Sequence, residues 1–422
     1  MIAAVVLLAL LFIGTPIAFA VALAVVTEVL PTGMTFGLVA QRIFAGLDSF
    51  SLLAVPLFIL AGELMNASDI TGRIINLAHS LFGTMRAGLA QVNIGASLIF
   101  AGISGSAVAD TSALGRVFIP SLEKEGYPRD FAAALTAAAS VIGPILPPSI
   151  PVIIYALIAS NLSVPALFLA GVVPGLLLGV GLGVYCWFFA AKYEKKKQKV
   201  SMQARMKAVR EGLVPIFMPV FIVTSIVMGV VTPTEAAAFA AGYALFAGLF
   251  ILRTLKLSDL PPVFISAMRD SSSILIIMGT VAAGNWLLTL HMIPQHVSAW
   301  VLEMLQSPWM FLLGVNILLL IVGLFLEGIA AMLVLVPILH PVALSFGIDP
   351  VHFGLVVIFN LMIGLITPPM GLCLFVADAI AHVGIGALAR RILPFFVVEV
   401  VVLVIITLVP ETTVWLPRAL GF

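Results

Sequence analysis

The chain has 422 residues, of which 62% are hydrophobic and only 9% are charged. Soluble proteins carry about 25% charged residues, so this composition excludes an ordinary water-soluble protein. The net charge of +1 gives no reason to expect nucleic-acid binding. Because a bilayer core requires roughly 20 apolar residues per helix, we expect an all-α polytopic membrane protein.

The N-terminal segment Met1–Val26 is apolar and has two possible interpretations. A signal peptide is one, but the segment lacks the basic start that a signal peptide needs. The other is a pair of membrane helices joined by a tight turn, which Gly14-Thr15-Pro16 favours. We expect the second, with scaffold helices continuing to residue 86.

The stretch Ala87–Leu122 is long enough for two helices, and a polar run, Ile103–Ser112, interrupts it. Glycines at 102 and 105 break the helix there and expose carbonyl groups on one side and N–H groups on the other. Carbonyl and hydroxyl oxygens suit a small cation, and helix N-termini favour an anionic group. A packing seam of small residues is the alternative, but such a seam rarely needs Asp110. We predict a re-entrant hairpin with an ion or cargo site at its tip.

The next apolar span, Phe131–Ala159, contains the segment Gly143–Pro151 at its middle. Prolines remove N–H donors and free the carbonyl groups one turn back, so they unwind a helix. The span Val351–Ala377 is broken in the same way by Gly364–Gly371. A simple kink is the alternative for a lone proline. Two double-proline breaks at matched depth favour ion and substrate coordination.

The basic residues are densest in the linker 192–211. The positive-inside rule puts this linker in the cytoplasm, as a solvated topology determinant rather than a binding patch. Tracing the chain outward from it puts 18 of the 20 Lys and Arg inside, and only Arg42 and Arg418 outside. The trace requires that Ala87–Leu122 and Trp309–Phe346 do not cross the membrane. Mixed polar and apolar linkers are expected to be helices at the interface: Gly33–Ser49, Thr71–Arg86, Leu255–Asp270 and His291–Pro308.

The tip of the second hairpin, Leu326–Ala331, aligns Glu327 with Ser106. An acidic residue at membrane depth is costly and is a functional candidate by default. It could bind a cation, carry a proton, or pair with Arg116 or another helix. Of the other polar residues in apolar runs, we expect helix or subunit contacts from Glu63, Asp378 and Glu399, and a structural role for His340.

Glycines and prolines recur when the chain is shifted by 221 residues: Gly102/Gly323, Pro120/Pro341, Gly126/Gly347, Gly143/Gly364, Pro147/Pro368 and Pro148/Pro369. Combined with the trace, this predicts two inverted repeats, as in many carriers that bind cargo between broken helices. The first is 1–191, with scaffold helices 1–86, a hairpin 87–122, a broken helix 131–159 and a helix 164–190. The second is 212–422, with scaffold helices 212–290, a hairpin 309–346, a broken helix 351–377 and a helix 394–416.

The sequence lacks the phosphate-cradling loop of ATP-driven transporters, the HExxH motif and a spaced nucleophile–histidine–acid set. We therefore expect no enzyme, but a secondary active transporter driven by an ion gradient. A passive channel and an intramembrane enzyme are weaker alternatives.

At these motifs the chain resembles the large, DctM-like membrane subunit of tripartite ATP-independent periplasmic (TRAP) transporters. The matching stretches run through nearly the whole chain in family order: Pro56–Asn66, Ser104–Asp110, Pro147–Pro151, Thr232–Ala236, Gly347–Pro350 and Gly364–Pro369. The resemblance implies elevator-type transport and scaffold domains in the bacterial inner membrane. It also implies a small four-helix membrane subunit as one partner. A periplasmic binding protein, the second implied partner, would deliver an organic acid such as a C4-dicarboxylate, sialic acid or another sugar or keto acid. A stand-alone carboxylate carrier without a binding protein is the alternative.

The resemblance implies cotransported Na⁺ at the two tips and two breaks. The Na⁺ ligands are expected from Ser104, Gly105, Gly143, Pro144, Pro147, Glu327, Gly328, Ile366, Thr367 and Pro368. Substrate contacts are expected from Ser106, Asp110, Thr111, Ser149, Gly328 and Met370. One departure concerns the second tip, where many relatives have Asp-x-Thr-Pro and this chain has Glu327-Gly328-Ile329-Ala330. Backbone ligation is therefore the safer expectation there.

Overall fold

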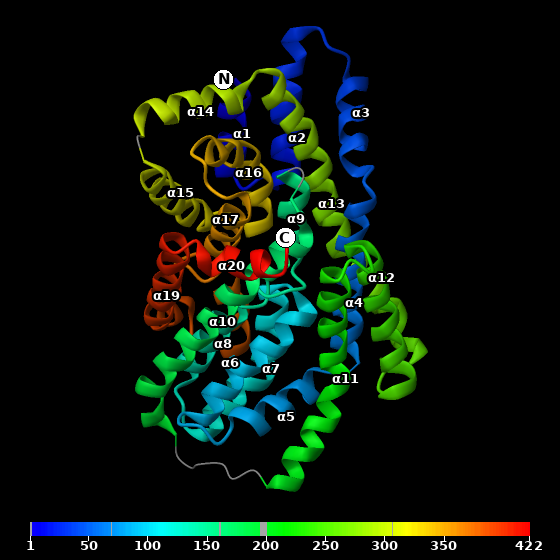
Figure 1. The fold of residues 1–422 in the computed structure, drawn as a ribbon, viewed down its shortest axis with the longest axis vertical. Helices are drawn as coiled ribbons and strands as arrows, with labels where there is room; N and C mark the ends of the chain where they lie inside the picture. The colour runs from blue at the N-terminus through cyan, green and yellow to red at the C-terminus, as the bar shows by residue number, and fades with distance from the viewer. Residues whose placement is uncertain (1, 69, 160–161, 195–200, 306) are drawn as a thin grey trace.

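The computed structural model describes residues 2–68, 70–159, 162–194, 201–305 and 307–422, and within those ranges every regular element is a helix. Seven of the described helical segments are long and apolar enough to cross a bilayer. These observations confirm the all-α polytopic membrane architecture, which Figure 1 shows with its long axis vertical.

The N-terminal part consists of five α-helices and two short 3-10 turns. Gly14, at φ +84°, lies in the turn between the first two helices, where a tight turn was predicted. Two of the predicted interface segments, Gly33–Ser49 and Thr71–Arg86, each contain one separate helix. The elements are α1 (Ile2–Phe12), α2 (Ile17–Val29), η1 (Leu30–Thr32), α3 (Phe36–Leu47), η2 (Phe50–Leu53), α4 (Ala54–Ala67) and α5 (Ile70–Phe82).

The predicted first hairpin and first broken helix are each a pair of helices. The hairpin helices α6 (Gly88–Ser104) and α7 (Ala107–Glu125) meet at Gly105, which takes the left-handed conformation. The helices α8 (Arg129–Ser140) and α9 (Ile150–Ile158) are separated by residues 141–149. The long helix α10 (Val164–Phe189) and the turn η3 (Ala191–Tyr193) follow.

The middle of the chain corrects two predicted boundaries. Of the linker 192–211, residues 195–200 lie outside the described residues, and α11 (Met202–Val227) already begins ten residues before the predicted boundary at 212. Ser201 caps it by accepting a hydrogen bond from the Ala204 N–H. The predicted interface helix Leu255–Asp270 is not a separate helix, because its residues from Leu260 onward form the start of α13 (Leu260–Leu290). Pro261 and Pro262 lie in its first turn, where a missing N–H costs nothing. The remaining elements are α12 (Pro233–Phe246), η4 (Ala247–Ile251), η5 (Leu257–Asp259) and α14 (Ile293–Met304).

The C-terminal part repeats the pattern of hairpin and broken helix. The elements are α15 (Pro308–Gly323), α16 (Gly328–Ser345), α17 (Pro350–Gly364), α18 (Leu372–Ala381), α19 (Ile385–Leu408) and α20 (Glu411–Ala419). The predicted single helix 394–416 was wrong. It begins nine residues earlier and ends before Pro410, where the separate helix α20 turns away.

The starts of three helices recur at the offset of the sequence repeat. α7, α8 and α10 begin at residues 107, 129 and 164, and α16, α17 and α19 begin at residues 328, 350 and 385, which is 221 later in each case. Both proline pairs, Pro147-Pro148 and Pro368-Pro369, have a cis peptide bond. The elements therefore recur in the same order. The opposite orientation of the two halves in the membrane stays a prediction.

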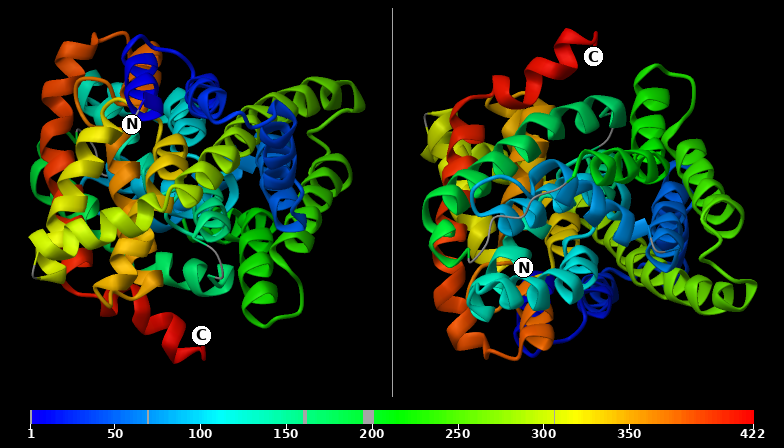
Figure 2. Two further views of the ribbon diagram at one scale, coloured as in Figure 1. Left: turned by 90° about the horizontal axis from the view of Figure 1, so that it is seen from above. Right: turned by 90° about the horizontal axis from the view of Figure 1, so that it is seen from below.

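Two groups of helices can be distinguished in space. Figure 2 shows α11–α13 and α4 standing beside a larger body that contains the hairpins and broken helices. Within the first group, α12 lies on α4 through small buried side chains such as Ala236, Ala240 and Ala244. Small residues allow helices to approach closely in a bilayer, where van der Waals packing replaces the hydrophobic driving force. α5 contacts both α11 and α6, and α14 contacts α13 and α16, so these two helices lie between the groups.

Candidate functional site

The first hairpin tip is built by three consecutive residues. Ser104 ends α6, Gly105 at φ +60° reverses the chain, and Ser106 caps α7 by accepting a hydrogen bond from the Ala109 N–H at 3.4 Å. A side chain at Gly105 would lie 3.3 Å from both the Pro148 carbonyl oxygen and the Ile150 amide nitrogen. The tip therefore rests directly on the first proline break, with backbone groups of both segments in contact.

Asp110, in the first turn of α7, is the most unusual side chain of the site. It is completely buried, and neither carboxylate oxygen has a hydrogen-bond partner. Ser104 lies near Asp110. However, the Ser104 hydroxyl donates its hydrogen bond to the Ser106 carbonyl oxygen, at 3.3 Å, and not to the Asp110 carboxylate. A side chain on Gly143 would collide with Oδ2 of Asp110, so the glycine makes room for this carboxylate. A buried carboxylate without partners is costly, and a bound cation is one way to compensate it.

The first break is held by Ser149. The Ser149 hydroxyl donates to the Pro144 carbonyl oxygen and accepts from the Val152 N–H, so it caps α9 while it closes the loop 141–149. Ser149 is almost completely buried. Ser149, a predicted substrate contact, is thus hydrogen-bonded to the Pro144 carbonyl oxygen, a predicted ion ligand. Pro147 is also close to the hairpin, because its carbonyl oxygen lies 3.6 Å from a side chain built on Gly102.

The second tip places Glu327 as the N-cap of α16. Its carboxylate accepts a hydrogen bond from the Ala330 N–H at 3.1 Å, and the side chain lies on the surface of the protein. Among the described residues Glu327 forms no ion pair, so the predicted alternative of a pair with Arg116 is not found. Gly328 packs against Leu361 and Met362 of α17, where a side chain would lie 2.6 Å from the Met362 methyl group.

The second break runs over residues 365–371 and is tied down by backbone groups. The Thr367 hydroxyl donates to the Ile363 carbonyl oxygen at 2.9 Å, and the Cys373 N–H donates to the Leu365 carbonyl oxygen at 3.0 Å. Ile366 is fully buried, Pro368 is half-buried and Met370 is exposed. At its start, Gly364 touches Gly323 of α15, where an added side chain would lie 2.8 Å from the Gly323 Cα.

Tertiary packing brings the two halves together crosswise. α7 and α8 of the first half contact α18 of the second, and α16 and α17 contact α9 of the first. Cys373 of α18 lies beside Thr111 and near Asp110 and Glu399. The first tip therefore contacts the first break, the second tip contacts α17 beside the second break, and Asp110 lies near α18, which follows the second break.

Polar bridges that the sequence reasoning missed connect each hairpin with a broken helix. Asn93 of α6 donates to the Thr136 hydroxyl of α8 at 2.8 Å, and Asn360 of α17 donates to the Asn316 side chain of α15 at 2.7 Å. These residues are 223 and 224 positions apart in the two halves. A lone Asn in an apolar segment, with a polar residue at a roughly corresponding position of the other half, would have been the signal.

The other acidic and histidine candidates have different roles. Asp378 accepts hydrogen bonds from the Val383 and Gly384 N–H groups and closes the turn after α18. His340 lies 3.0 Å from the Tyr155 hydroxyl, a helix contact of the structural kind predicted for it. Glu399 is completely buried on α19, and both of its carboxylate oxygens lack a hydrogen-bond partner. Glu63 is half-buried on α4.

The chemistry of these groups fits a small, hard cation. Ser104, Ser106, Thr111 and Asp110 offer hydroxyl and carboxylate oxygens, and the breaks add backbone carbonyl groups. Among the described residues, no three His, Cys, Asp or Glu side chains gather in a group that could hold a metal ion. Na⁺ prefers oxygen ligands and needs no such cluster, so the donor set is suited to Na⁺ rather than to a transition metal.

The protein-family model described as "Tripartite ATP-independent periplasmic transporter, DctM component" matches residues 4–412 of the chain. The chain belongs to this family. The sialic acid TRAP transporter large permease protein SiaM of Vibrio cholerae is 42% identical over 415 residues, which cover 97% of this chain and 96% of that protein. The C4-dicarboxylate TRAP transporter large permease protein DctM of Pseudomonas aeruginosa is 39% identical and covers 90% of both chains.

A solved structure has the same fold. The YdaH transporter of Alcanivorax borkumensis superposes with a TM-score of 0.64 over 88% of this chain and 87% of that chain, at 14% identity. Such low identity concerns the fold alone. The TRAP membership confirms the resemblance drawn from the motifs. The chain is a TRAP transporter permease and a multi-pass protein of the inner membrane.

Proposed function

We propose that this TRAP permease is the large subunit of a Na⁺-coupled, three-component importer of an organic acid. The observation that carries the proposal is Asp110, a buried carboxylate without partners at a tip of hydroxyl and carbonyl groups. The substrate class is a C4-dicarboxylate, sialic acid or a related sugar or keto acid, since relatives at 39% and 42% identity are named for such substrates.

In this proposal the ion and the substrate share the first tip. Ser104, Gly105 and the carbonyl groups of the first break hold Na⁺, while Asp110 balances its charge. The α7 N-terminus, with Ser106 as its cap, presents N–H groups that suit the carboxylate of the substrate. Gly328 at the second tip and Met370 in the second break complete the substrate contacts.

Coupling follows from charge. The buried Asp110 and the anionic substrate repel each other until a cation lies between them, so the loaded state requires both ligands. The larger body that contains the hairpins and breaks moves as an elevator domain against the α4, α11–α13 group. A small membrane subunit and a periplasmic binding protein are the partners, and the binding protein delivers the substrate.

The proposal is tested by reconstituting the permease with both partners in proteoliposomes whose interior contains neither ATP nor Na⁺. Substrate should accumulate when an inward Na⁺ gradient is imposed. This accumulation should stop when K⁺ replaces Na⁺. Accumulation that ignores Na⁺ and follows a pH gradient would contradict the coupling. Equal uptake without the binding protein would favour a stand-alone carrier.

A further inference from the structure

A groove lies between α5, α6 and α10, away from the tips and breaks. Its volume is about 480 Å³, within the range of roughly 300–1,000 Å³ that is usual for ligand sites. Apolar side chains line it from all three sides, among them Phe82, Ile94, Leu98, Val184 and Phe188. It opens outward, since Val184 is 51% and Phe188 is 65% exposed.

Glycines on two helices keep the groove hollow. Gly95 of α6 and Gly179 and Gly183 of α10 line it without side chains of their own. The helices are already in contact behind them, because a side chain on Gly179 would lie 2.9 Å from Leu98. The polar wall residue Gln91 is engaged, as its amide donates to the Gly183 carbonyl oxygen at 2.8 Å. The walls therefore offer an occupant only apolar contacts.

Two basic residues lie close in sequence to residues that line the groove. Arg86 follows the wall residue Met85, and Lys192 lies four residues after the wall residue Phe188. The chain segments that carry them are connected, because the Glu194 carboxylate accepts hydrogen bonds from the Ala87 and Gly88 N–H groups at 3.1 and 3.3 Å.

These bonds engage Glu194 at the α6 N-terminus, where a negative charge is favoured. Arg86 and Lys192 remain exposed and form no ion pair among the described residues. Lys192 lies 4.9 Å from the Tyr193 ring. A third cation, Arg205 of α11, donates to the Ser80 carbonyl oxygen of α5 at 3.1 Å, two residues before the wall residue Phe82.

We propose that this groove binds one anionic phospholipid of the cytoplasmic leaflet. The acyl chain lies along Phe82, Leu98 and Val184, and the phosphate is held by Arg86 and Lys192. Basic residues at the cytoplasmic ends of membrane helices attract anionic headgroups, and an apolar groove beside them excludes water from the chain. The predicted topology puts both cations on the cytoplasmic side, where anionic lipids and basic residues meet.

The bound lipid would join parts of the protein that belong to different groups. α5 packs on α11, whereas α6 and α10 belong to the larger body with the hairpins. One molecule in this groove contacts both sides of the junction. The lipid therefore fills the space that the side chains of α5, α6 and α10 leave open.

The test measures retained phospholipid. The full chain is purified in detergent, mixed with phosphatidylglycerol or with phosphatidylcholine, and passed through gel filtration before native mass spectrometry. One phosphatidylglycerol should remain bound, and the Arg86→Gln/Lys192→Gln variant should lose it. The Arg253→Gln/Arg269→Gln variant removes two exposed charges elsewhere and should retain it. Equal retention by both variants, or of both lipids by the native chain, would overturn the proposal.

A second measurement locates the acyl chain and does not depend on the charge variants. Trp187 lines the groove and is 39% exposed, so phosphatidylglycerol with brominated acyl chains should quench part of the tryptophan fluorescence. That quenched part should be lost in Trp187→Phe and in Val184→Trp, which fills the groove. Val401→Trp, at a similarly exposed position on α19, is the matched control and should still bind lipid. If Val184→Trp instead releases the small membrane subunit and leaves lipid retention unchanged, the groove is a protein interface.

Discussion

At the scale of single residues, Asp110 and Gly143 are packed against each other in the candidate site. The carboxylate occupies the space that any side chain at position 143 would need, and nothing in the described protein compensates its buried oxygens. Asp110 belongs to α7 and Gly143 to the break between α8 and α9, and both residues use the same space. Each can be tested separately.

Replacing Asp110 by Ala removes the charge that the proposed ion site requires. Losing contacts to a charged group costs about 1.5–3 kcal/mol, so Na⁺-dependent uptake should fall by roughly tenfold or more at limiting Na⁺. Uptake in proteoliposomes at several Na⁺ concentrations measures the effect. Glu123→Ala is the control, since its ion pair with Arg129 is exposed and such pairs contribute about 0–1 kcal/mol. Unchanged Na⁺ dependence in Asp110→Ala would mean that the site lies elsewhere.

Replacing Gly143 by Ala inserts a methyl group against Oδ2 of Asp110. Overpacking of a filled interior costs about 1–3 kcal/mol, so the variant should melt at a lower temperature and transport poorly. Gly386→Ala on α19 is a matched control, because an added side chain there meets no atom within 4 Å. Scanning fluorimetry in detergent compares the two variants. Equal melting temperatures would show that the contact relaxes without cost.

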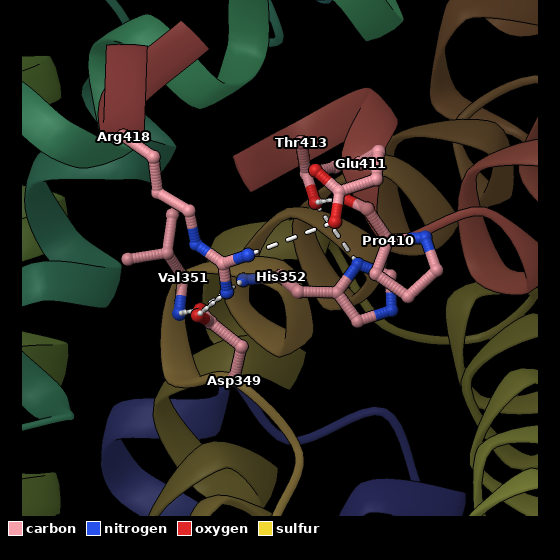
Figure 3. Close-up of polar contacts among 7 residues, drawn as sticks. All are labelled: Asp349, Val351, His352, Pro410, Glu411, Thr413 and Arg418. Carbon is pink, nitrogen blue, oxygen red and sulfur yellow. Dashed lines mark hydrogen bonds and ion pairs between the residues drawn. The ribbon is translucent and has the colours of Figure 1, made fainter. Parts of the chain in front are cut away.

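At the scale of elements, helix α20 is fastened to the start of α17 by the polar cluster in Figure 3. Arg418 lies 3.1 Å from Oδ2 of Asp349, and the Thr413 hydroxyl lies 2.9 Å from Nδ1 of His352. Asp349 has a second role, since its Oδ1 accepts hydrogen bonds from the Val351 and His352 N–H groups and caps α17. The Asp349 carboxylate thus caps the start of α17 and also anchors α20 to it.

This double role predicts unequal effects of two substitutions. Asp349→Ala loses both a helix cap, worth about 0.5–2 kcal/mol, and the ion pair. Arg418→Ala loses only exposed ion pairs of about 0–1 kcal/mol. The thermal unfolding temperature should therefore fall more in Asp349→Ala than in Arg418→Ala. Glu411→Ala, whose carboxylate lies 3.6 Å from Arg418, should have the smallest effect. The reverse order would show that the anchor outweighs the cap.

At the scale of the whole molecule, the two halves are predicted to have opposite orientations in the membrane. Lys124 and Ser345 test this directly, because they are 221 positions apart, exposed, and at the ends of α7 and α16. Ser345→Cys should react with a membrane-impermeant maleimide in intact cells, and Lys124→Cys only in inverted vesicles. The native Cys186 and Cys373 are buried and give little background. Labelling of both positions from the same side would exclude inverted repeats.

Much of the architecture could be predicted because each half marks its own breaks. Gly105, Pro147 and Pro368 interrupt helices wherever they occur, since their effect on the backbone is local. The exact ends of the helices were less predictable. α13 begins at Leu260, inside the stretch 255–270 that is mixed in polarity, and continues to Leu290, and α19 ends at Leu408 rather than at 416. The end of α19 has a local cause in Pro410, whereas composition alone does not give the start of α13.

The candidate site shows the same division. Sequence alone identified the polar tip and Asp110, because hydroxyl and carboxylate groups are expensive in an apolar run. It could not show that Ser149 is engaged with Pro144, that Glu327 is a surface cap, or that Asn93 and Asn360 bridge the helices.

The sequence by itself determined the solvent of this protein, its helical class, its family and the places where helices break, because these depend on composition and on local backbone chemistry. Only the tertiary structure decided which helices of the two halves meet. α18 of one half lies on α7 and α8 of the other, and Asp110 is left without partners at that crossing. Contacts between distant segments depend on how whole helices fit together in three dimensions, and no local pattern records that fit.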